Sequence, residues 1–275
     1  MIIGNRYFDT RNNTYVMGIL NVTPDSFSDG GKYNTLDAAL FHAEEMIADG
    51  ADIIDIGGES TRPGYTMISE EEEISRTAPV IAAIKERFDV PLSIDTYKSK
   101  VAAAAVEAGV DMVNDAWGLK YDENMAKVIC DSGKACCLMH NREKAEYTDF
   151  FAELQSDLQG ILKTAKGAGI AAQKVMIDPG IGFGKTYPQN LEVICRLREL
   201  QQWGYPVMLG ASRKSVIGLT LDLPVDERVE GTLVTTVLAV ENSCAFVRVH
   251  DVKENVRAIR MIEAILNYET AKLVK

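Results

Sequence analysis

The chain lacks the features that mark membrane, secreted and nucleic-acid-binding proteins. No apolar run reaches about 18 residues and the N-terminus, MIIGNRYFDT, has no apolar segment, so we expect neither a membrane span nor a signal peptide. The five cysteines are an odd number without metal-type spacing, which favours buried free thiols in a cytoplasmic protein over disulfides. Basic residues are also scarce, 29 against 40 acidic ones, and the net charge of −11 disfavours binding to nucleic acid or an anionic membrane. A small anionic substrate would still need only a local cluster of cations.

What the sequence has instead is a repeated pattern of short apolar runs that end on polar residues. Eight such runs occur, and the gaps between their ends are long enough for crossover helices. Strands of a parallel sheet are buried on both faces and therefore read as apolar runs. The pattern predicts an α/β fold, a (β/α)₈ TIM barrel, with its active site where the strands end. The predicted ends lie near residues 22, 58, 96, 116, 140, 180, 212 and 251.

The length predicts a single domain over residues 1–275, since one barrel is typically this long. Residues 1–14 precede the first strand of the barrel. We expect them to form a hairpin that caps the barrel bottom, from Ile2–Ile3 and Tyr7–Phe8 with a turn at Asn12–Asn13. Apolar periodicity and end signals predict eight helices. They are expected over Leu36–Asp49, Glu70–Phe88, Ser99–Ala108, Glu123–Ser132, Phe150–Ala168, Gln189–Trp203, Asp226–Glu241 and Val252–Tyr268.

Three strand-end segments have the composition of binding loops. Asn21–Tyr33 and Gly57–Ser69 are long and rich in glycine, proline and small polar residues, which is typical of lids and binding loops on this face of a barrel. The third, GIGFGKT (180–186), looks like a phosphate-binding loop. A Walker A motif requires glycine where this chain has Pro179, and a dinucleotide-binding motif requires it where the chain has Lys185. Neither an NTPase nor a dinucleotide-binding fold is therefore supported.

Seven segments, in this order, resemble dihydropteroate synthase and together span roughly residues 15 to 255. They are MGILNVTPDSFSDGG (17–31), IDIGGESTRPG (54–64), SIDTYK (93–98), NDAWG (114–118), DPGIGFGKT (178–186), GASRKS (210–215) and RVHDVKE (248–254). The resemblance implies a (β/α)₈ barrel enzyme, a homodimeric transferase of folate biosynthesis. Such an enzyme would join 6-hydroxymethyl-7,8-dihydropterin pyrophosphate to 4-aminobenzoate with Mg²⁺ as cofactor. Sulfonamides would then be expected to compete with 4-aminobenzoate.

The side chains at several strand ends suit a pterin ring. Its aminopyrimidinone edge has adjacent N–H donors and a carbonyl acceptor. Asp178 supplies a carboxylate that can accept two N–H bonds. Asn114 supplies an amide that can both donate and accept, and Lys214 supplies an ammonium that can donate to the carbonyl or a ring nitrogen. Asp95 is a second carboxylate, and the resemblance implies that Met139 packs against the ring. Each polar residue also has a structural interpretation, such as a turn cap at Asp178 or a helix cap at Asp95.

A pyrophosphate leaving group requires a local concentration of positive charge. Arg248 and His250 alternate along the last predicted strand, so both side chains point to the same side of it. Phosphate sites in these barrels often use the loops after strands seven and eight. The resemblance assigns Asn21, Thr61, Arg248, Val249 and His250 to the pyrophosphate, and Asn21 to Mg²⁺ as well. One amide oxygen with phosphate oxygens and water is normal for Mg²⁺.

The resemblance also implies a displacement in which carbon–oxygen cleavage runs ahead of attack by the aniline nitrogen. Asp25, Asp95 and Lys214 are the expected catalytic residues, with the two carboxylates stabilising the pterin cation. Closed loops would exclude water. The expected 4-aminobenzoate site combines aromatic side chains for the ring with polar groups for the carboxylate. Its residues are Phe27, Thr61, Arg62, Pro63, Phe183, Lys214 and Ser215.

Three other functions remain open at the level of sequence. A methyltetrahydrofolate–corrinoid methyltransferase would share the pterin-binding residues but would not need the basic pair of the last strand. An aldolase-type barrel would use Lys214 as a Schiff base, with its pKa lowered by the neighbouring Arg213. A non-catalytic pterin-binding paralogue would be expected to have damaged loops, whereas both are intact here. His140 is expected to be structural, and segment 141–150 matches no recognisable pattern.

Overall fold

The computed structural model describes residues 1–23, 32–59 and 67–268. Within them, eight parallel strands pair in the order β8–β7–β6–β5–β4–β3–β10–β9. A parallel bridge between Ile177 of β8 and Val207, next to β9, closes this sheet into a barrel. The predicted (β/α)₈ fold is therefore confirmed. The strands are β3 (Tyr15–Asn21), β4 (Ile53–Gly57), β5 (Leu92–Asp95), β6 (Met112–Asp115), β7 (Ala135–Met139), β8 (Val175–Asp178), β9 (Met208–Leu209) and β10 (Phe246–Val249).

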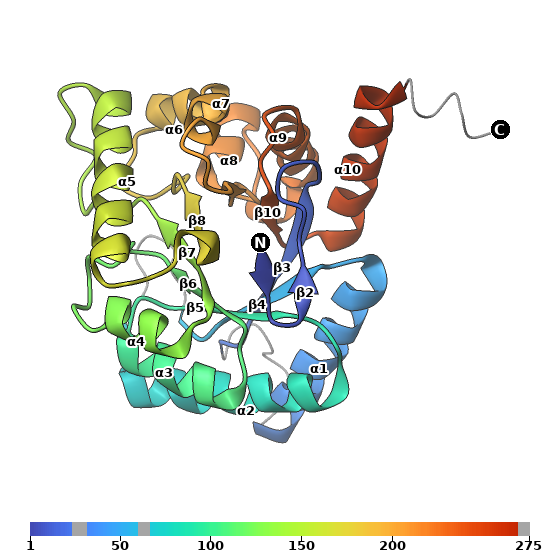
Figure 1. Cartoon of the computed structure of the whole chain (residues 1–275). Helices are drawn as coiled ribbons and strands as arrows, with labels where there is room; N and C mark the ends of the chain where they lie inside the picture. Colours follow the sequence, from blue (N-terminus) through green and yellow to red (C-terminus); the bar gives the residue numbers. More distant parts are fainter. Residues whose placement is uncertain (24–31, 60–66, 269–275) are drawn as a thin grey trace.

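Helices encircle the strands, and the N-terminal hairpin lies near the centre of the view in Figure 1. Most helices agree with the sequence-based ranges. The predicted Gln189–Trp203 helix is interrupted at Arg196 and forms two helices, and α8 was not predicted because its seven residues, SVIGLTL, read as an apolar run. The helices are α1 (Lys32–Asp49), α2 (Glu70–Arg87), α3 (Ser99–Ala108), α4 (Met125–Ser132), α5 (Phe150–Gly167), α6 (Tyr187–Cys195), α7 (Leu197–Gln201), α8 (Ser215–Leu221), α9 (Val229–Glu241) and α10 (Val252–Leu266).

Local signals explain where several of these helices begin and end. The hydroxyl of Ser69 accepts a hydrogen bond from the backbone N–H of Glu72, and four glutamates occupy the first turn of α2, where they favour the helix dipole. Gly109 and Gly133 end α3 and α4 with φ of 111° and 62°, in the left-handed region where glycine is favoured. Among the described residues, no helix is both long and apolar enough to cross a bilayer.

Alternation of side chains along the strands divides the core into two layers. Side chains such as Val16, Ile54 and Val247 point outward and pack against the helices. Inward-pointing side chains at the beginning of the strands, including Met17 and Phe246, form a second buried cluster inside the barrel. This inner cluster fills the N-terminal half, so the space for a ligand lies toward the ends of the strands.

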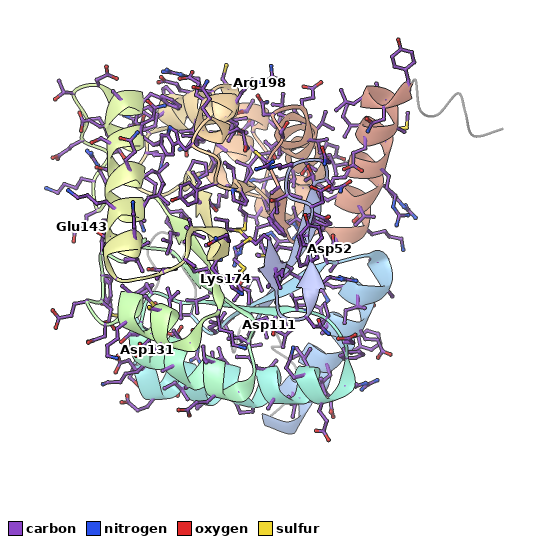
Figure 2. The ribbon with its side chains drawn as sticks, viewed as in Figure 1. Asp52, Asp111, Asp131, Glu143, Lys174 and Arg198 are labelled. Atoms are coloured by element: carbon purple, nitrogen blue, oxygen red, sulfur yellow. The ribbon has the colours of Figure 1, made fainter. Side chains whose placement is uncertain are left out.

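The N-terminal hairpin supplies the floor of the inner cluster. Its strands are β1 (Ile2–Ile3) and β2 (Arg6–Tyr7), and the chain turns at Gly4, whose φ is 61°. The hairpin turn is thus earlier than predicted. Asn12 and Asn13 form the following turn, with their N–H groups bonded to the carbonyl oxygen of Asp9. Ile3 and Phe8 are fully buried in the inner cluster, and the labelled Asp52 and Asp111 lie beside the hairpin in Figure 2.

Candidate active site

Polar side chains from several strands meet inside the barrel, above the inner apolar cluster. We call Asp55, Asp95, Asn114, Asp178, Lys214 and Arg248 the polar cluster. Five of them occupy inward-facing positions, Asp55 in the middle of its strand and the other four in the later half of theirs, and Lys214 follows β9 just before α8. Asp55, Asn114 and Asp178 are at most 5% exposed. Four of the five predicted pterin-binding residues therefore lie together in the described structure.

Arg248 is at the centre of this cluster, between two carboxylates. Its Nε donates to Asp55 Oδ2 at 2.5 Å, and its Nη2 donates to Asp95 Oδ2 at 2.6 Å. Asp55 Oδ2 also accepts from Asn114 Nδ2 at 3.1 Å. Asp55 is completely buried and holds both the arginine and the amide in place. Sequence analysis missed Asp55. The alternation of the apolar run IIDIG shows that its side chain lies on the same face as Ile53, but not that it pairs with Arg248.

Burial and charge oppose each other in this part of the cluster. Burial raises the pKa of Asp95 to about 7, with Arg248 opposing that rise and Asp55 adding to it. Burial also disfavours the charged form of Arg248, but Asp55 and Asp95 outweigh it and hold the pKa of the guanidinium above its ordinary value. The arginine therefore stays charged. Asp95 is poised between its two protonation states near neutral pH.

Asp178 and Lys214 form the other half of the cluster, next to Gly210. A Cβ at Gly210 would lie 3.3 Å from Asp178 Oδ2 and 3.9 Å from Lys214 Nζ, so the glycine leaves room between them. Burial raises the pKa of Asp178, against the opposing effect of Lys214. Burial lowers the pKa of Lys214 to about 8, with Asp178 opposing. Arg213 instead pairs with Asp251, with Nε 2.9 Å from Oδ2, so the expected lowering by Arg213 is not the cause.

Other predicted residues lie around the same end of the barrel. Met139 ends β7 and is 5% exposed. The Phe183 ring centroid is 4.6 Å from Lys214 Nζ. His250 Nδ1 lies 3.0 Å from Ser212 Oγ, whereas the side chain of Val249 packs outward against the helices. Ser215 is exposed at the first turn of α8.

Asn21 ends β3 and fits a Mg²⁺ ligand of the kind that binds with substrate phosphate. A Cβ at Gly57 would lie 3.5 Å from Asn21 Oδ1 and 4.0 Å from Asp95 Oδ2, so these two oxygens border the same small space. Within the described ranges, no group of three or more histidine, cysteine or acidic residues is arranged to hold a metal. The donor set therefore suits Mg²⁺ that takes its remaining ligands from phosphate and water.

Five of the predicted residues lie outside the described ranges. They are Asp25 and Phe27 of the first loop, and Thr61, Arg62 and Pro63 of the second. The described residues that flank the second loop form a buried cluster that sequence analysis missed. Lys98 Nζ donates to Glu59 Oε2 at 2.7 Å, to Glu73 Oε2 at 2.8 Å and to the carbonyl oxygen of Ile68 at 2.9 Å.

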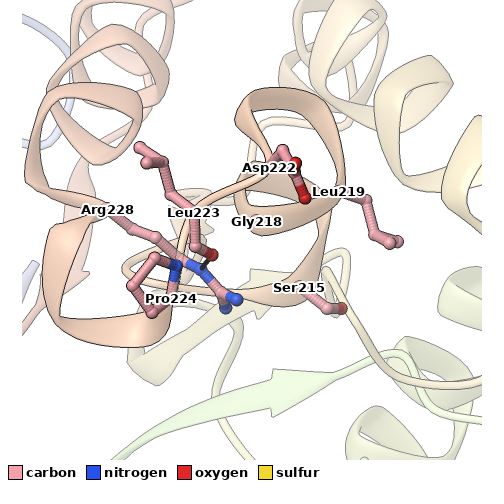
Figure 3. A pocket seen from close by; sticks show the side chains of 7 residues that line it. All are labelled: Ser215, Gly218, Leu219, Asp222, Leu223, Pro224 and Arg228. Carbon is pink, nitrogen blue, oxygen red and sulfur yellow. Dashed lines mark hydrogen bonds between the residues drawn. The ribbon is translucent and has the colours of Figure 1, made fainter.

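A separate hollow of about 430 Å³ lies beside α8, as Figure 3 shows. Arg228 lines it, and its Nε and Nη1 donate to the carbonyl oxygens of Leu223 and Arg213, both at 3.0 Å. The arginine thereby ties the turn after α8 to the strand-end segment before it. Of the described residues that line this hollow, Ser215 alone was predicted to belong to the site. The hollow is therefore distinct from the polar cluster inside the barrel.

Comparison with known sequences relates the chain to one family. The family model of the pterin binding enzymes matches residues 17–250. A dihydropteroate synthase of Clostridium beijerinckii is 57% identical over 267 residues, which is 97% of this chain and 99% of that protein. The similarity thus covers the barrel and the polar cluster, rather than a single motif.

Solved structures give the same relation. A dihydropteroate synthase of Clostridium difficile, crystallised in the presence of pteroic acid, has a TM-score of 0.92 and 50% identity, with 94% of this chain and 99% of that one covered. The Xanthomonas albilineans enzyme with 4-aminobenzoic acid has a TM-score of 0.89 and 41% identity, over 93% and 94% of the two chains. Pteroic acid contains a 4-aminobenzoate unit, so both structures were obtained with molecules that carry this unit.

Proposed function

This chain belongs to the pterin-binding enzyme family, and we propose from that premise how its residues perform dihydropteroate synthesis. The reaction is a transfer that joins 6-hydroxymethyl-7,8-dihydropterin pyrophosphate to 4-aminobenzoate and yields 7,8-dihydropteroate and pyrophosphate. One observation carries the assignment of residues. Carboxylates, an amide and a lysine from separate strand ends lie together inside the barrel, at the only end that the inner apolar cluster leaves open among the described residues.

We define the pterin slot as Asp95, Asn114, Met139, Asp178 and Lys214. Asp178 accepts the adjacent N–H groups of the aminopyrimidinone edge. Asn114 presents its carbonyl oxygen to the ring, because its Nδ2 is already bonded to Asp55. Lys214 donates to the ring carbonyl or a ring nitrogen, and Met139 packs against the ring face. Asp95 stabilises the positive charge that develops at the pterin methylene.

Release of pyrophosphate uses the last strand. The guanidinium of Arg248 has Nε and Nη2 committed to carboxylates, and within the described residues no partner of Nη1 is found, so Nη1 is available to a phosphate oxygen. His250 and the backbone at Val249 lie beside it, and Thr61 adds a hydroxyl. Mg²⁺ held by Asn21 and the pyrophosphate oxygens would neutralise the leaving group.

The second substrate binds over the pterin. Phe183, next to Lys214, and Phe27 of the first loop contact the ring of 4-aminobenzoate, while the hydroxyl of Ser215, at the start of α8, donates a hydrogen bond to its carboxylate. Thr61, Arg62 and Pro63 complete this site, and Asp25 acts with Asp95 on the cation. The carbon–oxygen bond breaks with its electrons passing to pyrophosphate, and the aniline nitrogen then bonds to the methylene carbon and loses a proton. Sulfonamides compete for the same site.

Pyrophosphate release from the dihydropterin pyrophosphate, measured with and without 4-aminobenzoate, tests these assignments. We expect release that depends on 4-aminobenzoate and gives dihydropteroate. Asp178→Asn should weaken binding of the pterin substrate strongly, because an amide cannot accept both ring N–H bonds. Asp131→Asn on the surface of α4 is the matched control. Unchanged pterin binding in Asp178→Asn would refute the slot.

The outer faces of α9 and α10 support a homodimer. Val234 of α9 and Met261 and Ile265 of α10 are 62%, 62% and 52% exposed, although all three are large and apolar. Burial of such a face against a second copy removes apolar area from water. Sedimentation should give a dimer for the native chain and a monomer for the Val234→Glu, Met261→Glu double variant. A native monomer would contradict this assembly.

A further inference from the structure

The segment that looks like a phosphate-binding loop, Gly180–Lys185, directs its lysine toward the protein and not toward a ligand site. In a phosphate loop the lysine faces the ligand, whereas Lys185 turns back under its own segment. Its Nζ lies 2.8 Å from the carbonyl oxygen of Gly180, 3.0 Å from that of Phe183 and 2.9 Å from Nδ1 of His140. An ammonium has three protons to donate. All three are therefore directed at groups of the protein, and none is left for a phosphate.

His140 provides the third of these acceptors and is itself fully buried. Burial lowers the pKa of Lys185 well below its ordinary value, and the charge of Asp178 opposes that fall. In its ammonium form Lys185 only donates, so His140 Nδ1 accepts and the ring proton lies on Nε2. Nε2 is 3.0 Å from Asp157 Oδ2, which also accepts from Arg142 Nε at 2.7 Å. Burial and the charge of Lys185 lower the pKa of His140 to about 3, which agrees with a neutral ring. A chain of contacts thus runs from α5 through the imidazole to Lys185.

The opposite side of the same loop touches the pterin slot. The N–H of Gly180 donates to Asp178 Oδ1 at 2.7 Å, which fixes that carboxylate. The carbonyl oxygen of Ile181 accepts from Lys214 Nζ. Gly180 is closely packed as well, since a Cβ there would lie 2.0 Å from the carbonyl oxygen of His140. The loop therefore transmits the position of Lys185 directly to two groups of the slot.

We propose that Lys185, oriented by His140 and Asp157, is a positioning residue for Asp178 and Lys214 and does not bind phosphate. This inference rests on the proposed pterin slot. The contacts give a role to Lys185 and His140, which take no part in the proposed reaction. They also explain why a sequence similar to a phosphate loop occurs at a pterin site, because glycines allow the backbone to fold over the lysine and lysine supplies the three bonds that hold it there.

The test compares two ligands that bind different parts of the site. Titration calorimetry with pteroic acid reports on the slot, and titration with inorganic pyrophosphate and Mg²⁺ reports on the last strand. For Lys185→Met we expect pteroic acid affinity to fall about 10- to 100-fold, the range for misaligned charge-assisted bonds, with pyrophosphate affinity unchanged. Lys163→Met, at an exposed position of α5, should leave both affinities unchanged. Loss of pyrophosphate affinity alone, or equal loss of both, would overturn the proposal.

A second pair of variants keeps the test valid if Lys185→Met does not fold. His140→Asn retains an oxygen that can accept from Lys185, whereas His140→Leu does not, so Asn should preserve more pteroic acid affinity than Leu. ¹⁵N NMR of the native chain should show the His140 proton on Nε2, and a proton on Nδ1 would refute the contact chain. Asp178→Asn separates the two proposals. If Asp178→Asn leaves pteroic acid affinity intact, the proposed slot is wrong. If Asp178→Asn weakens binding but Lys185→Met does not, only the role of Lys185 is wrong.

Discussion

Lys98 offers the sharpest test of how the barrel is held together beside its second loop. The side chains of Lys98, Glu59 and Glu73 are 5%, 3% and 2% exposed, and the ammonium donates to both carboxylates and to the backbone of Ile68. These groups come from the segment that follows β4, from α2 and from the residue that precedes α3. Lys98→Met keeps the length and apolar stem of the side chain but removes its charge and its three bonds.

The expected cost follows from what the substitution leaves behind. Two buried carboxylates would lose their counter-charge, and breaking a buried pair by removing one partner costs about 3–5 kcal/mol of unfolding free energy. Lys127→Met is the control, because Lys127 and its partner Asp131 are 75% and 63% exposed. An exposed pair contributes about 0–1 kcal/mol. Lys127 has one exposed partner, whereas Lys98 has two buried carboxylates, so the comparison measures the cost of leaving buried charges unpaired.

Urea unfolding at pH 7 and pH 5 measures both the size and the origin of the effect. Burial raises the pKa of Glu73, and Lys98 opposes that rise. Without Lys98 the folded pKa rises further above the unfolded value, so the free-energy loss should grow as pH increases and shrink toward pH 5. Replacing Glu59 and Glu73 by Gln in the Lys98→Met background should restore much of the stability. A loss below about 1 kcal/mol, or one independent of pH, would refute the reasoning.

Three further predictions concern the site. The kcat/KM profile should fall below pH about 7 as Asp95 becomes protonated and above pH about 8 as Lys214 loses its proton, and Lys214→Arg should remove the alkaline limb if it retains activity. Gly180→Ala should lower the melting temperature and weaken pteroic acid binding, because φ is 71° and the new Cβ would clash with His140; native-like melting would contradict this. Phe183→Ala should raise KM for 4-aminobenzoate about tenfold with a smaller change in kcat, because one aromatic contact is lost. Steady-state kinetics measures this, and an unchanged KM would contradict the contact.

The sequence alone predicted the fold and the strand-end residues of the site because both depend on local patterns. Apolar runs that stop on polar residues located Asp95, Asn114 and Asp178, and the parallel topology then brings such ends to one edge. Chemical type also suggests which contact with the pterin ring each residue could make, and those contacts stay predictions. The two long loops were recognised by composition, but their predicted residues lie outside the described ranges and stay predictions.

The residues that sequence analysis missed act through partners distant in the chain. Asp55 lies in the middle of β4, and only the pairing of strands brings its carboxylate to Arg248, 193 residues later. Lys98 and Glu59 are 39 residues apart, and the two segments that contain them, SIDTYK and IDIGGESTRPG, give no sign that the side chains pair. Burial decides these roles, since a lysine or aspartate inside the barrel must be paired, whereas the same residue on the surface need not be. A sequence does not state which of its charges will be buried together.

The charge of the polar cluster leads to a last prediction about the metal. Arg248 and Lys214 face three carboxylates, Asp55, Asp95 and Asp178, so the polar cluster has no excess of positive charge to attract the pyrophosphate that we propose binds beside it. Arg248 alone cannot supply the attraction, since two of those carboxylates already share it. Binding of inorganic pyrophosphate, measured by calorimetry, should therefore depend strongly on Mg²⁺, with about tenfold or greater loss when EDTA is added. Equal affinity with and without Mg²⁺ would mean that cations outside the described ranges, such as Arg62, supply the attraction instead.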